Sequence, residues 1–315
     1  MVQDYLKKKQ IVICIAIFCS ILWGSAFPVL KVSYIEMQMD ADDTIAKIVL
    51  AGYRFLLAGV ILLVGMFFTK RKALRLTRRQ TLFIIIFGVV QTAFQYYFFY
   101  NGLANTSGIQ GAILVSSGTF FTVLLAHFFY RNDRLDRQKA FGLVAGFAGI
   151  IVANWGQELS FSFHFTGEGF MILAALTGAI GTIMAKEMAI GIHPFALTGW
   201  QLTIGSILML AFGMPQMKAD AIIFTPLGWG LLLYSALLSA VAFALWYSIL
   251  KYNKAGEISM YKFITPVSGV ILSAWFIPGE TLDMFIFIAI GLVGLGIIAI
   301  NYKPNDKKSK KKMPV

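Results

Sequence analysis

Long apolar runs separated by short polar loops follow one another along the whole chain. Each run has about 18 residues or more, enough to cross ~30 Å of hydrocarbon as a helix rising 1.5 Å per residue. No stretch between the runs has the length of a soluble domain, so the predicted fold is an all-α polytopic membrane protein. The pattern predicts ten transmembrane helices, near residues 11–32, 48–69, 81–103, 109–130, 139–156, 168–190, 196–214, 227–251, 258–278 and 284–302.

The composition supports this fold class. Of the 315 residues, 58% are hydrophobic and 13% are charged, with a mean hydropathy of +0.75; soluble domains are about half apolar and a quarter charged. The first apolar run follows a basic segment, as in a signal peptide, but it is too long and no small-x-small cleavage site follows it. We therefore expect the first run to be retained as a transmembrane helix.

The net charge of +12 could indicate nucleic-acid binding, but the placement of the charges indicates membrane topology instead. Basic residues gather in alternate loops, and acidic residues dominate the loops between them. The positive-inside rule then places both termini in the cytoplasm and favours an even number of spans. The basic loop residues include Lys7–Lys9, Lys70–Lys72, Arg75, Arg78, Arg79, Arg131, Arg134, Arg137, Lys139, Lys251 and Lys254, and the acidic ones include Glu36, Asp40, Asp42, Asp43, Glu158, Glu280 and Asp283.

The two halves of the sequence resemble each other. A shift of 147 residues relates Tyr100 to Tyr247, Arg54 to Gln201, Gly52 to Gly199 and Asn154 to Asn301. Because each half has five predicted spans, an odd number, the second half must be inverted in the membrane, as in many secondary transporters. The predicted domains are a first five-helix repeat (1–156), an inverted second repeat (157–303) and a basic cytoplasmic tail (304–315).

Several motifs occur in a characteristic order: WGSAFP at 23–28, YRFLLAG at 53–59, NGLANTSGIQGAIL from 101, GLVAGFAGIIVAN from 142, LAALTGAIGTIMAKE from 173, LWYSILKYNKAGEISMYKFITPV from 245 and GLVGLGIIAIN from 291. In this order the sequence resembles the drug/metabolite transporter superfamily, specifically its EamA-type ten-span permeases. The resemblance implies a bacterial plasma-membrane protein that exports small metabolites, most often amino acids and related compounds.

The resemblance has one departure. Family halves usually carry a proline in the fourth and ninth spans and a Gly-Glu pair after them. The second half has Pro266 and Gly279-Glu280, whereas the first has Thr119 and Asn132-Asp133. The helix break is therefore expected to be weaker in the first half.

Two cations are predicted to lie inside spans, Arg54 and Lys262. An ionisable side chain at membrane depth is costly and usually faces a partner or a polar cavity. Pro266 removes a backbone hydrogen bond and should free a carbonyl near Lys262, and the face of that helix continues through Gly269 and Ser273. A broken helix beside a cation predicts a site for a carboxylate; the alternatives are a structural tie for Arg54, snorkelling of Lys262 and simple curvature at Pro266.

Other side chains could line a polar path between the repeats. Trp23, Trp200 and Trp246 are either interface anchors or cavity walls, and Trp246, close to a span end, is the most anchor-like of the three. The predicted substrate-binding set is Lys262, Arg54, Gln91, Gln95, Gln201, Trp23, Trp200 and Tyr261, with Pro266, Pro28 and Gly269 as helix-break or gating positions.

No motif in the sequence indicates catalysis. It has no GxSxG, HExxH or phosphate-binding loop, and the one glutamate well inside a predicted span is Glu187. We therefore expect a secondary transporter for carboxylate metabolites and not an enzyme, without cofactor or metal, monomeric or homodimeric, in contact with membrane lipid and not with nucleic acid. The alternatives are an exporter of drugs or lipid-linked sugars, and a receptor or scaffold that does not transport.

Overall fold

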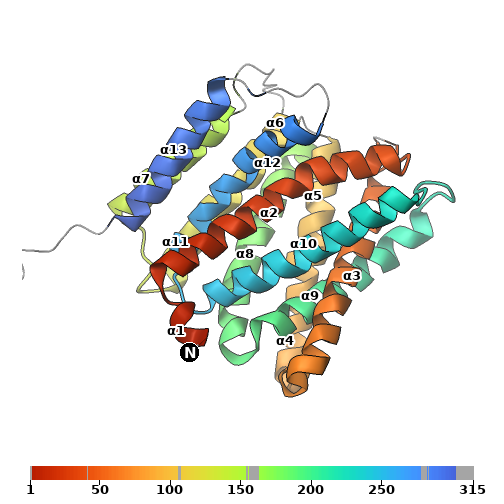
Figure 1. Cartoon of the computed structure of the whole chain (residues 1–315), viewed down its shortest axis with the longest axis horizontal. Coiled ribbons are helices and arrows are strands. Elements are labelled where there is room, and N and C mark those ends of the chain that lie inside the picture. Colours follow the sequence, from red (N-terminus) through yellow and green to blue (C-terminus); the bar gives the residue numbers. More distant parts are fainter. Residues whose placement is uncertain are drawn as a thin grey trace, which may run out of the picture.

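The structure is a computed structural model that describes residues 2–40, 42–105, 108–153, 155, 163–277, 282 and 284–302. The predictions that concern Asn154, Glu158, Gly279, Glu280, Asp283 and the tail 304–315 fall outside these residues. Within the described ranges the chain forms helices and no strand (Figure 1). The α-helices are α1 Val2–Tyr5, α2 Lys9–Glu36, α3 Thr44–Lys70, α4 Arg78–Gly88, α5 Gln95–Ala104, α6 Gly108–Phe129, α7 Arg137–Ala153, α8 Phe170–Gly191, α9 Pro194–Gly213, α10 Pro226–Leu250, α11 Ala255–Ser259, α12 Ile264–Phe276 and α13 Met284–Asn301.

Every predicted span overlaps a helix or a run of consecutive helices. In two spans an irregular turn lies between consecutive α-helices: the π-helical turn Val89–Phe94 joins α4 to α5, and the 3-10 turn Met260–Phe263 joins α11 to α12. The all-helical, multi-pass membrane fold is confirmed, and the count of ten spans stays a prediction. Seven helical segments of the described chain are long and apolar enough to cross a membrane: Lys9–Glu36, Thr44–Leu74, Arg78–Ala104, Phe165–Gly191, Pro194–Gln216, Pro226–Leu250 and Met284–Asn301.

Local sequence determines where individual spans begin. The Thr225 hydroxyl accepts a hydrogen bond from the Gly228 backbone N–H at 3.0 Å, and Pro226 occupies the first position of α10. Thr77 and Gln80 form a reciprocal capping box before α4. Such caps satisfy backbone donors that the first helical turn leaves without partners.

The helices pack in a pattern that is symmetric between the halves. α3 packs on α9 and α7 packs on α13, so in each of these pairs a helix contacts its own counterpart; Figure 1 shows α7 and α13 side by side at one edge of the molecule. The remaining large contacts come in related pairs. α2 packs on α10 and α12, and its counterpart α8 packs on α5 and α6.

Glycines bring α3 and α9 together at two related points. A Cβ atom on Gly52 would lie 2.7 Å from the Leu210 side chain, and one on Gly199 would lie 2.9 Å from the Leu63 side chain. The shift of 147 residues relates Gly52 to Gly199 and Leu63 to Leu210, so the two contacts are counterparts. Small residues at such points let membrane helices approach closely.

The α6–α7 connection carries a buried ion pair. The Lys139 Nζ lies 2.6 Å from the Asp133 Oδ1, and the two side chains are 3% and 1% exposed. The Asp133 Oδ2 also accepts a hydrogen bond at 2.8 Å from the backbone N–H of Gly256 in α11, and the Lys139 Nζ donates to the Arg134 carbonyl at 2.8 Å. The pair ties the loop of the first half to the helix that leads into Lys262.

Candidate functional site

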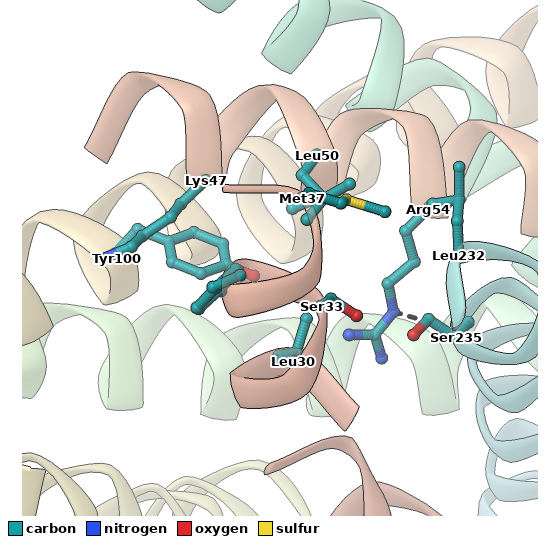
Figure 2. A pocket seen from close by; sticks show the side chains of 11 residues that line it. Leu30, Ser33, Met37, Lys47, Leu50, Arg54, Tyr100, Leu232 and Ser235 are labelled. Carbon is teal, nitrogen blue, oxygen red and sulfur yellow. Dashed lines mark hydrogen bonds between the residues drawn. The ribbon is translucent and has the colours of Figure 1, made fainter. Parts of the chain in front are cut away.

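Arg54 lies on α3, where α2 and α10 approach it, and it is 4% exposed. Its Nε donates to the Ser239 hydroxyl at 2.7 Å. It also donates to the Ser235 carbonyl at 3.1 Å, a bond drawn in Figure 2. In the described part of the chain no aspartate or glutamate forms an ion pair with Arg54. A guanidinium cannot lose its charge in a protein. Arg54 is therefore a buried cation without a counterion from the described chain.

A pocket lies beside Arg54, between α2, α3, α5 and α10. Its polar lining includes Ser33, Tyr34, Lys47 and Tyr100, and Figure 2 shows the guanidinium facing the space near Ser33. The Lys47 Nζ lies 5.4 Å from the centre of the Tyr34 ring. The two cations suit an anionic group. The cavity volume is about 10 Å³, room for about one water molecule, so a metabolite could enter only after the surrounding helices separate.

Lys262 is the second cation inside a predicted span, and it lies in the turn between α11 and α12. Its Nζ lies 5.3 Å from the Trp246 ring centre and 5.8 Å from that of Trp23. It also donates a hydrogen bond at 3.3 Å to the hydroxyl of Thr182 on α8. The π faces of tryptophan attract a cation, which explains how an apolar span tolerates this lysine. As with Arg54, no carboxylate of the described residues pairs with it.

Neighbouring helices supply hydrogen-bond partners for the backbone of the irregular stretch at Lys262. Pro266 lies in the first turn of α12, where a missing N–H is tolerated, and the 3-10 turn precedes it. The Ser20 hydroxyl donates to the Tyr261 carbonyl at 3.0 Å, and the Thr119 hydroxyl donates to the Ser259 carbonyl at 3.4 Å. The carbonyls of Tyr261 and Ser259 in this irregular stretch therefore accept hydrogen bonds from hydroxyls of α2 and α6.

The other two predicted gating positions differ from each other. α2 continues through Pro28, so this proline does not end the helix. Gly269 faces α2, where an added Cβ would lie 2.7 Å from the Phe27 ring. Gly269 therefore permits close packing of α12 on α2.

The surroundings of Arg54 and of Lys262 lie along one interface between α2 and α10. Leu30, which lines the Arg54 pocket, follows Trp23 by seven residues on α2, and Trp246 follows Ser239 by seven residues on α10. Seven residues of helix span about 10 Å. Since Trp23 and Trp246 are in contact, with ring centres 5.0 Å apart, Arg54 and Lys262 mark two depths of the same interface.

The predicted glutamines fall into two groups. The Gln91 Nε2 donates to the side-chain Oε1 of Gln95 at 2.7 Å. Gln91 also packs on Gly181 of α8, next to Thr182, the hydroxyl partner of Lys262. The Gln91 Oε1 is buried and has no hydrogen-bond partner in the described structure. Gln201 is fully buried, bonds to the Thr92 hydroxyl and accepts from the Tyr247 hydroxyl at 3.3 Å. Gln201 is thus engaged in packing between helices.

Two further predicted residues point away from the interface. Trp200 lines an apolar groove between α4 and α9, with Ile204 and Leu208. The Tyr261 hydroxyl accepts a hydrogen bond from the Asn301 amide on α13 at 2.6 Å. The structure does not bring either aromatic ring to Arg54 or to Lys262.

The interpretation of Trp246 as an interface anchor is wrong. This side chain is 1% exposed, because α2 and the Lys262 side chain cover it. Sequence reasoning also did not assign Tyr34 and Thr182 to the site. Ser235 and Ser239 carry a signal, since their spacing of four places both on one helical face.

Taken together, the described helices form a multi-pass membrane protein with a cation-lined interface buried between them, the architecture of a membrane transporter. Within these residues no group of three or more His, Cys, Asp or Glu side chains could hold a metal ion.

The chain belongs to the family described as the EamA-like transporter family, whose sequence profile matches residues 10–155 and 165–302. It is 27% identical over 268 residues to the uncharacterized transporter YetK of Bacillus subtilis, covering 81% of this chain and 79% of that protein. It is 25% identical to an uncharacterized transporter of Archaeoglobus fulgidus, covering 89% and 91% of the two chains. A solved crystal structure shares the fold with a TM-score of 0.74 at 14% identity, over 90% of this chain and 94% of that one.

Proposed function

We propose that the protein is a secondary transporter that exports amino acids or related carboxylate compounds across the plasma membrane by alternating access. The observation that carries this proposal is the presence of two cations, the buried Arg54 and the partly buried Lys262, in one helix interface without a carboxylate from the described chain. A buried charge without a counterion costs several kcal/mol. A substrate carboxylate that visits each cation in turn would supply the missing charge.

The symmetric packing supports two inverted repeats of five spans. Related helix pairs exchange when the halves are exchanged, and the Gly52–Leu210 contact has its counterpart in Gly199–Leu63. In inverted-repeat transporters the substrate site lies between the repeats. The interface between α2 and α10 fits this expectation, since one helix comes from each half.

The alternative substrates are drugs and lipid-linked sugars. Aromatic rings at Trp23, Phe243 and Trp246 could hold an apolar group. A cationic drug at these rings would meet the ammonium of Lys262, which lies within 6 Å of two of the ring centres, and like charges repel. The rings and the lysine together favour an anionic amphipathic substrate, such as an amino acid with an apolar side chain.

The energy coupling we propose is that of a facilitator or exchanger. Proton-coupled transporters commonly use carboxylates at membrane depth. Glu187, near the predicted cytoplasmic end of α8, accepts a hydrogen bond from the Tyr130 hydroxyl at 2.8 Å. It is therefore engaged near the membrane surface, away from Arg54.

A ligand screen tests the substrate class. Thermal unfolding of the purified protein would be measured with amino acids, nucleotides, sugar phosphates and cationic drugs, because a ligand that binds the folded state raises its apparent stability. We expect stabilisation by a carboxylate, and loss of that stabilisation in Lys262→Gln at unchanged yield. Lys218→Gln, at an exposed loop lysine, is the matched control and should respond as wild type.

Two outcomes would overturn the proposal. Stabilisation by cationic drugs alone would favour the drug exporter. If proteoliposomes that contain the protein take up none of these ligands when a ligand gradient is imposed, a receptor or scaffold would be favoured.

Cysteine labelling tests the proposed topology of ten spans with both termini in the cytoplasm. In a background with Cys14→Ala and Cys19→Ala, a cysteine at Lys218 should react with an impermeant thiol reagent from outside intact cells. A cysteine at Arg134 should react only after permeabilisation. Both positions are exposed, so reaction of Arg134→Cys from outside would reverse the assigned orientation.

A further inference from the structure

An apolar groove of about 530 Å³ lies between α4, α9 and the segment that joins α3 to α4. Figure 1 shows α4 and α9 close together at one end of the molecule, and the two helices pack on each other. Ile84 forms a fully buried floor, whereas Ile85, Ile207 and Leu208 on the rim are 42%, 52% and 41% exposed. This volume lies within the range of ligand pockets, about 300–1,000 Å³, and the lining suits hydrocarbon.

The lining of the groove is almost entirely apolar. The Thr81 hydroxyl donates to the Thr77 carbonyl on its own helix at 3.1 Å. The indole nitrogen of Trp200 is buried and has no hydrogen-bond partner in the described structure, and the lining residues other than Trp200 and Thr81 are leucines and isoleucines. An occupant of this groove is therefore recognised through its apolar part.

A strongly basic segment borders one end of the groove. Five exposed cations lie within nine residues, and Arg75 stands between Leu74 and Leu76, which both line the groove. From Thr44 to Asn132 the sequence contains no aspartate or glutamate, so these charges have no acidic neighbour along the chain. The N-terminal end of α4 adds partial positive charge at the same place. The five cations are Arg71, Lys72, Arg75, Arg78 and Arg79.

Two of these cations are already placed against aromatic rings. The guanidinium of Arg71 lies 4.7 Å from the Phe67 ring centre, and that of Arg79 lies 5.6 Å from the Phe83 ring centre. Arg75 and Arg78 have no such ring contact in the described structure and flank the groove end. Arginine binds phosphate oxygens in a bidentate manner.

We propose that the groove and the adjoining arginines form a binding site for one anionic phospholipid of the cytoplasmic leaflet. One acyl chain occupies the space between α4 and α9, and Arg75 and Arg78 hold the phosphate. Charge complementarity supports this occupant, because the positive-inside rule places the segment at the leaflet that carries anionic lipid. The site is separate from the proposed substrate interface, so it does not depend on the transported compound.

Native mass spectrometry of the detergent-purified protein would test the site, with phosphatidylglycerol, phosphatidylcholine and inorganic phosphate as separate probes. We expect one phosphatidylglycerol to be retained, and its affinity to fall about tenfold or more in the double variant Arg75→Gln, Arg78→Gln, since each basic residue near a membrane contributes roughly 1 kcal/mol. Leu208→Trp, which fills the groove from an exposed rim position, should lower the affinity with the arginines intact.

The matched control is the double variant Arg134→Gln, Arg137→Gln, which removes two exposed cations from another predicted cytoplasmic loop. It should bind phosphatidylglycerol as wild type does. An equal loss of phosphatidylglycerol affinity in this control would mean that general surface charge holds the lipid, and this result would overturn the proposed site. Equal retention of phosphatidylcholine would reduce it to ordinary lipid contact, and displacement of the lipid by inorganic phosphate would assign the arginines to a free anion.

Discussion

Two sets of charges inside this protein occupy different environments. Asp133 and Lys139 are paired at 2.6 Å, and the Asp133 carboxylate also accepts the Gly256 N–H. Arg54 and Lys262 have hydroxyl, carbonyl or aromatic partners and no carboxylate in the described chain. The first pair is complete by itself and holds a loop on α11. The second set lacks a counterion in the described chain, as we expect of the proposed carboxylate site when no ligand is bound.

Asp133 and Lys139 each have a counterion, whereas Arg54 and Lys262, the cations of the proposed site, have none in the described chain. Removing one member of a complete pair leaves the other buried without a partner, and this lowers the stability of the fold. Removing a cation that has no counterion relieves its desolvation cost but also loses its hydrogen bonds, so we expect the stability to change little and binding of the proposed ligand to be lost.

The largest expected effect is that of Asp133→Asn, which leaves the Lys139 ammonium buried and unpaired. We expect a loss of about 3–5 kcal/mol in the free energy of unfolding, measured as a lower unfolding temperature of the detergent-purified protein. The double variant Asp133→Asn, Lys139→Met should recover most of the loss, because it removes both charges. A double variant as unstable as the single one would show that the Gly256 contact, and not the ion pair, is what matters.

The second effect concerns Arg54→Gln. Hydrogen bonds to charged groups contribute about 1.5–3 kcal/mol, so carboxylate affinity should fall about tenfold or more, while the unfolding temperature changes much less than in Asp133→Asn. Arg54→Lys keeps the charge, loses the planar fork and should be intermediate. Binding assays beside thermal unfolding would check this. The comparison fails if Arg54→Gln unfolds as readily as Asp133→Asn and still binds its ligand.

A smaller effect is expected at the exposed pair of Lys254 and Glu257. These side chains are 42% and 41% exposed and lie 2.8 Å apart; the hydrogen bond to Glu257 raises the pKa of Lys254. Exposed ion pairs contribute about 0–1 kcal/mol, so Glu257→Gln should lower stability by no more than this. A loss comparable to that of Asp133→Asn would mean that counterion geometry matters more than burial.

The smallest effect is a pH dependence at His193, where acid creates an unpaired cation. Burial lowers the pKa of His193, and the nearby charges of Lys70 and Lys251 lower it further. The folded state then binds fewer protons than the unfolded state, so stability is constant well above pH 6.5 and falls as the pH drops through about 6.5 toward the lower folded-state pKa. His193→Asn keeps a side chain able to cap α9 and should lose this slope in thermal unfolding between about pH 5 and 8. Parallel curves for the two proteins would contradict the assignment.

Much of the fold could be predicted from the sequence, because membrane spans are defined by composition over a fixed length. The partners of Arg54 could not be predicted, since Ser235 and Ser239 lie 181 and 185 residues away. Pro266 indicated a break near Lys262, but not that the hydroxyls of Ser20 and Thr119 would bond to carbonyls of the same stretch. These features depend on how α2, α6 and α10 pack, which apolar periodicity does not specify.

The same limit explains the two aromatic residues whose positions differ most from a simple interpretation. Trp246 lies near the end of a predicted span, and only the packing of α2 shows that it is buried. Trp200 precedes Gln201 in sequence, yet successive residues on a helix point in different directions, so one lines a groove toward lipid and the other is fully buried.

The close contacts between α3 and α9 have a consequence for motion. If the two halves exchange conformations during transport, the pairs α3–α9 and α7–α13 are each carried onto themselves, and the contacts of Gly52 and Gly199 merely trade places. The pair α2–α10 is carried onto α8–α5 instead. A single conformation then contains the geometry of the opposite one: the way α5 now packs on α8 describes how α10 would pack on α2 once the protein has opened to the other side of the membrane.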